Sequence, residues 1–137
     1  MTRAFKAVFA TVIVMFLTGC ATVGDLTTTV PVGRWQFATD LDKTSACLVG
    51  AMNAEWQPKS NVEQFFGRSI AHSIVTVEPG RVNHIVHEHI APTTIWVVVV
   101  TRDDSNHAIA TAHILSSPAG SDAKLRIERA ATICGGK

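Results

Sequence analysis

Histidine is the residue type in this chain with the most scope for chemistry, and it is concentrated in the segment 84–89, whose sequence is His-Ile-Val-His-Glu-His. Alternate side chains of a strand share a face, so His87 and His89 would offer zinc or copper two imidazole nitrogens on one side. Candidates for a third ligand are His72, His107 and His113. Two ligands do not make a site, and the simpler interpretation is that these histidines are solvated. A pH response also stays open, because clustered imidazoles titrate at about pH 6.5 and repel each other when charged.

Catalytic chemistry is not indicated by any motif. The chain has no Gly-x-Ser-x-Gly nucleophile elbow, no His-Glu-x-x-His zinc motif and no phosphate-binding glycine loop. Its acidic residues are scattered, and no pair has a spacing that demands general acid–base work. We therefore expect a protein that is not an enzyme and that uses no cofactor.

The first twenty residues indicate where the protein resides. Arg3 and Lys6 precede an unbroken apolar run over 7–17, and small residues then lead to Cys20. This order of charge, apolar core and small residues is typical of a secretory signal peptide. The run is too short for a permanent membrane span, which needs about twenty residues.

The tetrad Leu17-Thr18-Gly19-Cys20 resembles the lipobox of bacterial lipoproteins, and the resemblance covers residues 1–21. It implies that a diacylglycerol is attached to the sulfur of Cys20, that the chain is cut before Cys20, and that the new N-terminus is acylated, for instance with palmitate. Ala21 stands where an aspartate would favour the inner membrane, so the resemblance implies an outer-membrane protein that faces the periplasm. An ordinary cleaved signal peptide is the alternative.

The organisation that follows is a cleaved signal peptide over 1–19, a lipidated N-terminus and tether over 20–33, and one small α+β domain over 34–137. Loss of Arg3 and Lys6 from a chain with 12 basic and 11 acidic residues leaves a near-neutral protein. Such a charge balance gives no electrostatic footprint for nucleic acid. The expected partner at the N-terminus is membrane lipid.

If Cys20 carries the lipid, Cys47 and Cys134 remain as a pair in a compartment that permits disulfides. A bond between them would close a long loop and, in the chain-entropy model, stabilise the domain by about 4 to 5 kcal/mol. Small residues recur at helical spacing around both cysteines, which would let two helices approach closely. Two buried free thiols and metal ligation are the alternatives.

The elements that must position these residues follow from periodicity. We predict a first helix that contains Cys47 and begins at Asp40 or Asp42, and a final helix that is capped by Ser121 or Asp122 and stopped by Gly135. A short capped turn is expected over 61–66. Strands are expected over 69–77, 82–90, 94–101 and 107–115, with a type II turn at Pro79-Gly80 between the first two.

The predicted fold class is α+β: a helix, a four-stranded antiparallel meander and a helix, with both helices on one sheet face. Trp35 and Phe37 alternate as in a short edge strand, or simply cap the core. In the strand over 94–101 both faces are apolar, so one apolar set would be left in water unless the tether or the 57–67 connection covers it.

An apolar sheet face left in water favours contact with another protein or with a second copy of the chain. The expected function is therefore that of a membrane-anchored, non-catalytic envelope lipoprotein that binds protein through its sheet face or strand edges. The alternatives are a periplasmic zinc or copper protein that uses His87 and His89, and, more weakly, an inhibitor of an envelope hydrolase.

Overall fold

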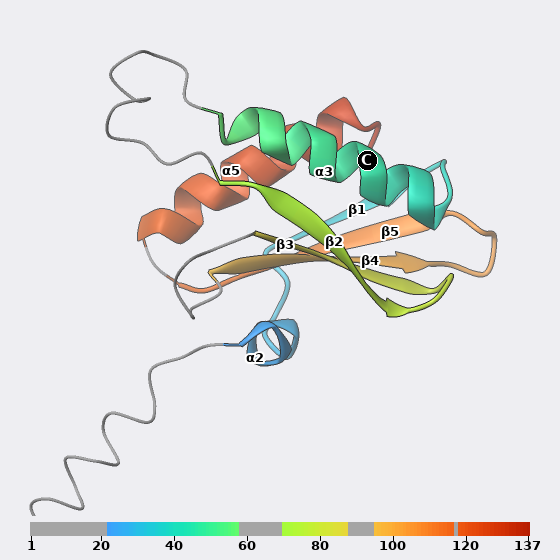
Figure 1. Ribbon diagram of the computed structural model, residues 1–137, viewed down its shortest axis with the longest axis horizontal. Helices are drawn as coiled ribbons and strands as arrows, with labels where there is room; N and C mark the ends of the chain where they lie inside the picture. Colours follow the sequence, from blue (N-terminus) through green and yellow to red (C-terminus); the bar gives the residue numbers. More distant parts are fainter. Residues whose placement is uncertain (1–21, 58–69, 88–94, 117) are drawn as a thin grey trace, which may run out of the picture.

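The computed structural model describes residues 22–57, 70–87, 95–116 and 118–137. Its elements run along the chain as α2 (Val23–Thr27), β1 (Gly33–Phe37), α3 (Leu41–Glu55), β2 (His72–Glu78), β3 (Val82–His87), β4 (Trp96–Arg102), β5 (Ala108–Ile114) and α5 (Pro118–Ile133). Figure 1 shows α3 and α5 layered over one face of a twisted sheet, with α2 on the other side. The α+β class is confirmed.

The sheet has five antiparallel strands rather than the predicted four, in the order β1-β5-β4-β3-β2. The meander β2 to β5 is present, and β1 joins it at the outer side of β5. Trp35 of β1 lies beside Ala110 and Phe37 beside Ala108, so each aromatic ring has a small cross-strand neighbour. The prediction counted one strand too few because it treated the segment with these two aromatic residues only as a possible edge strand and did not add it to the sheet.

A polar cap, a proline and a glycine mark three of the four ends of the two long helices. Asp40 is the N-cap of α3 and its carboxylate accepts a hydrogen bond from the Lys43 N–H at 2.9 Å, as predicted. Helix α5 begins at Pro118, earlier than the predicted caps, and Pro is favoured in a first turn. Gly135 follows α5 with a φ of +81°, a conformation that suits glycine.

The hydrophobic core lies between the helices and the face of β4 that carries Trp96, Val98 and Val100. Helix α3 turns Leu48 and Met52 toward it, and α5 adds Ile127 with its neighbouring alanines. Val98 itself is fully buried there. The opposite set, which includes Val97 and Val99, faces away from the two helices.

The predicted disulfide is present between Cys47 and Cys134, whose Cα atoms are 5.9 Å apart. Cys47 lies within α3, whereas Cys134 lies in the turn directly after α5 instead of inside that helix. The bond joins residues 87 positions apart, so it ties the first long helix to the C-terminal end of the chain.

The segment expected to be a tether is folded in part. Thr22 caps the short helix α2 through a capping box with Asp25, and Leu26 is buried on the sheet face opposite α3 and α5. The His113 ring then donates from Nδ1 to the Thr29 carbonyl oxygen at 3.0 Å. Docking of the tether on this sheet face was one of the alternatives that the sequence left open, but the helix was not predicted, because a single leucine supplies its buried apolar surface.

Several sequence predictions fall outside the described residues: the leader and Cys20, the capped turn over 61–66, and His89 in the second predicted strand. The turn at Pro79-Gly80 is confirmed, with Gly80 at a φ of +70°. In the described ranges no helix combines the length and apolarity that a membrane span requires.

Candidate interaction surface

Two of the described histidines lie inside the core and are held by hydrogen bonds. His72 accepts from the Trp96 Nε1–H at 3.2 Å through its Nε2, and its Nδ1 lies 3.1 Å from the Asn53 side-chain oxygen. A ring that accepts at Nε2 carries its proton on Nδ1, so it donates to Asn53. Burial, with a smaller effect from the charge of His87, lowers the pKa of His72 to about 4. His72 is therefore neutral at pH 7.

His87, one of the two candidate metal ligands, is also buried on the core face. Its Nε2 accepts the Ile95 N–H at 3.2 Å, and its ring centroid lies 4.5 Å from that of Trp96. A nitrogen used in this way is not available to a metal ion. The role that the geometry supports for His87 is packing and hydrogen bonding at the end of the core.

The remaining described histidines are scattered. His84 and His113 face the side away from the long helices, and burial, together with the charge of His113, lowers the pKa of His84. His107 lies in the exposed turn before β5, where its N–H bonds to Asp103. Among the described residues no group of three His, Cys, Asp or Glu side chains could hold a metal ion. Of the proposed third ligands, His72 lies beside His87 as its cross-strand partner, but its ring is hydrogen-bonded to Trp96 and Asn53; His107 and His113 are not brought to His87.

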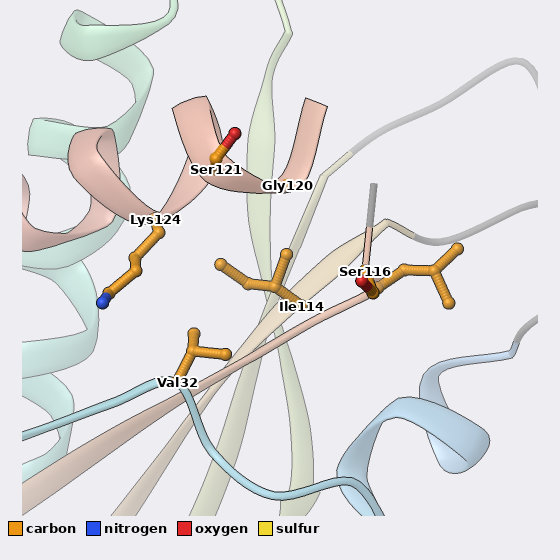
Figure 2. A pocket seen from close by; sticks show the side chains of 7 residues that line it. Val32, Ile114, Ser116, Gly120, Ser121 and Lys124 are labelled. Carbon is orange, nitrogen blue, oxygen red and sulfur yellow. The ribbon is translucent and has the colours of Figure 1, made fainter. Parts of the chain in front are cut away.

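The hollow drawn in Figure 2 is small, with a volume of about 270 Å³. It lies between the start of α5 and the end of β5 and is lined by Val32, Ile114, Leu115, Ser116, Gly120, Ser121 and Lys124. Lys124 is the titratable side chain of this lining, and its ammonium lies 3.6 Å from the Glu128 carboxylate on the next turn. The lining of the hollow is therefore mainly apolar. Among the described residues that line it, the one charged side chain, Lys124, is ion-paired with Glu128, and no pair of side chains is suited to acid–base catalysis.

The sheet face opposite α3 and α5 is covered in part by α2, which belongs to the segment predicted as a tether, and the rest of it carries exposed or half-buried apolar side chains. We use "open face" for the part of it formed by Val75, Val82, His84, Val99, Ile109 and Thr111, which are exposed or half-buried. Strand register places Val75 beside His84, and His84 beside Val99. Helix α2 covers the neighbouring part, where Val97 is fully buried. The open face is thus continuous as far as β2.

Strand β2 is the most exposed apolar element of the sheet. The side chains of Ile74, Val75 and Val77 are 40%, 47% and 54% exposed, although they belong to a regular strand. It lies at one margin of the sheet, where only β3 pairs with it. Edge strands of this kind are usually blunted by lysine, proline or a cover. Within 72–77 the sequence has neither lysine nor proline.

The opposite margin is covered by the chain itself. Gln36 of β1 donates its N–H to the Lys137 carbonyl oxygen at 2.9 Å, and the Lys137 N–H bonds back to Gln36 at 3.1 Å. The C-terminal residue therefore occupies the outer side of β1 as a short additional strand would. The two margins of the sheet differ: one is covered by residue 137, and the other presents β-branched apolar side chains.

Comparison with protein-family models, with curated proteins and with solved structures finds no match for this chain. Sequence reasoning singled out the histidines and the strand over 94–101, and it did not single out β2 as a surface. A signal was present, since Ile74-Val75-Thr76-Val77 is an uninterrupted run of β-branched residues directly before the turn.

Proposed function

We propose that this protein is a membrane-anchored lipoprotein of the cell envelope whose domain binds protein and performs no catalysis. The observation that carries the proposal is the exposed apolar edge strand β2, continuous with the open face. A sheet edge offers main-chain hydrogen bonds and alternate side-chain pockets, which is how many domains recruit an extended segment of a partner.

The anchor is supported by the leader and its lipobox-like tetrad, and by the disulfide. Bonds such as Cys47–Cys134 form and persist mainly outside the reducing cytosol. The hydrophobic gain of two or more acyl chains holds a protein at a membrane stably, whereas a single chain binds reversibly. Attachment at Cys20 would place the lipid three residues before Val23, the first residue of α2.

The metal-binding alternative gains no support from the positions of the histidines. His87 is buried and bonded to Ile95, and His84 lies on the opposite face of β3. The inhibitor alternative has no feature of its own in the described residues that distinguishes it from other protein binding. Of the three functions, protein binding is the one that the exposed strand β2 supports.

One experiment tests the anchor and the interaction together. Cells that make the full chain are supplied with labelled palmitate and treated with an amine-reactive cross-linker, beside cells that make Cys20→Ser. We expect label in the unaltered chain and in a larger cross-linked complex, and we expect Cys20→Ser to remain unprocessed and unlabelled. A chain that takes up no label refutes the anchor, and a labelled chain that yields no complex with any protein refutes the interaction.

A further inference from the structure

We infer that the occupant of the β2 edge is a second copy of this chain, paired strand to strand so that two sheets join into one. The inference rests on the proposed function, because it names the partner of the interaction. It follows from which backbone groups of β2 point outward, from the side chains around them, and from where the chain enters the domain.

The hydrogen-bond phase of the sheet identifies the outward groups. Arg102 donates its N–H to the Arg81 carbonyl oxygen at 3.0 Å, so these two opposite residues form a hydrogen-bonded pair. Bonded and non-bonded pairs alternate along antiparallel strands. The odd-numbered residues of β3 therefore form the hydrogen bonds to β4. The even-numbered residues of β3 must then bond to β2, where their register partners are Ser73, Val75 and Glu78.

Ile74 and Thr76 consequently turn their N–H and C=O groups away from β3. His72 has the same phase, and its N–H confirms the assignment because it donates away from β3, to the Asn53 side-chain oxygen at 2.7 Å. Within the described residues no such bond caps Ile74 or Thr76. These two residues form the free part of the edge.

A two-fold axis at Val75 satisfies these groups completely. Ile74 of each copy then pairs with Thr76 of the other, and each exchanges both of its backbone hydrogen bonds. Val75 lies opposite Val75 of the second copy as a non-hydrogen-bonded pair. A shift along the strand in either direction would require His72, whose N–H is already used, or Glu78, which faces Val82.

The side chains suit contact with an identical strand. From Ser73 to Val77 the strand has no charged residue, so pairing sets no like charges against each other. The nearest charges, Glu78 and Arg81, neutralise each other across the turn at 3.1 Å. Ile74, Val75 and Val77 are β-branched, and cross-strand pairs of β-branched residues stabilise sheets.

The anchor favours a second copy over an unrelated protein. A two-fold axis between antiparallel edge strands stands perpendicular to the sheet, so both α2 helices lie on the same side of the joined sheet, opposite the long helices. Both chains would therefore enter from one side, as attachment to a single membrane demands. Confinement of both copies to that membrane also raises their effective concentration.

A cysteine at the axis tests the pairing in the full, membrane-bound chain. The non-bonded pair places Cα atoms about 4.5 Å apart, a separation that a disulfide can bridge. We expect Val75→Cys to shift most of the protein to twice its monomer mass on a non-reducing gel, and reduction to reverse the shift. Leu125→Cys is the matched control, since Leu125 is 55% exposed on α5, more than Val75, and should give no such shift.

A second variant tests the same contact without a cysteine. Val75→Asp sets two carboxylates against each other at the axis while the side chain stays on the surface, so the detergent-extracted protein should sediment as a monomer. The unaltered chain should sediment at twice that mass. Pairing between copies is overturned if the cross-linked Val75→Cys product has a mass other than that of two chains. It is also overturned if no cross-linked product forms although the protein still carries labelled palmitate. In both cases the palmitate label reports separately whether the anchor of the proposed function stands.

Discussion

The ring of His72 is a junction between three elements of the fold. It belongs to β2, donates to Asn53 of α3 and accepts from Trp96 of β4. The indole of Trp56 lies against it at 4.8 Å and stacks on Trp96 at 5.0 Å. A histidine placed in this way stabilises the domain only while it is neutral, because protonation would remove the acceptor and charge a buried group.

We therefore predict that acid destabilises the domain through His72. Its pKa is about 4 in the folded chain and is near 6.5 when unfolded, so the unfolded chain binds more protons between these values. Stability is fully present above about pH 6.5 and falls by roughly 3 kcal/mol as the pH decreases to about 4. Urea unfolding at several pH values measures this slope.

His72→Gln provides the control for this pH dependence. The amide retains a donor and an acceptor but cannot titrate, so the variant should be less stable at pH 7 and should lose much of the slope between pH 4 and 6.5. The partly buried His84, whose pKa is also lowered, accounts for a remainder of the same sign. An unchanged slope in His72→Gln would contradict the role that we give to this ring.

The histidines show what alternation along a strand can and cannot predict. The period of two correctly separates His84 from His87, which lie on opposite faces of β3. It does not say which face the helices cover, since both faces of the neighbouring strand β4 are apolar. Only the packing of α3 and α5 over Trp96 and Val98 places His87 in the core and removes it as a surface ligand.

At the scale of elements, the disulfide fastens α3 to the residue after α5. We predict that the double variant Cys47→Ser and Cys134→Ser folds but loses about 2 to 5 kcal/mol of stability, because its unfolded chain is no longer constrained by a long loop. The midpoint of urea unfolding measures the loss. A reducing agent should lower the midpoint of the unaltered chain toward that of the variant and leave the variant unchanged. Equal midpoints for both proteins without reductant would count against the prediction.

The elements that the sequence predicted best are those whose ends are marked by capping or turn residues. Asp40 marks the start of α3, Gly135 the end of the last helix, and Pro79-Gly80 the first hairpin turn. Strand β1 was missed as a member of the sheet because its partner is β5, distant in sequence, and a short local pattern carries no sign of a long-range pair. Helix α2 was missed because its burial depends on one residue, Leu26, and on a sheet face that exists only after folding.

For the molecule as a whole, the two margins of the sheet would set how far the strand pairing that we propose can extend. The C-terminal strand-like cover of β1 depends on close packing of Gly136, where an added Cβ would lie 2.9 Å from the Phe37 ring and 3.0 Å from the Ala131 carbonyl oxygen. We predict that Gly136→Val displaces residue 137 and exposes the outer groups of β1.

With both margins free, association should extend beyond pairs. Light scattering of detergent-extracted Gly136→Val should report a mass above that of two chains. Gly50→Ala serves as the control, because a Cβ there has open space around it and should leave the mass unchanged. If Gly136→Val keeps the mass of the unaltered protein, the cover at β1 does not limit assembly.

The docking of α2 has a consequence for how the protein would sit on a bilayer. From Cys20 to the first turn of α2 the backbone can reach roughly 10 Å, so a lipid at Cys20 would keep α2, and with it the sheet face on which α2 docks, close to the headgroups. The open face would then lie on the membrane side of the domain, and the outer surface of α3 and α5 would face the aqueous space. Antibodies raised against α5 should bind the membrane-anchored protein. Two copies of the chain would meet by lateral diffusion in the plane of the membrane.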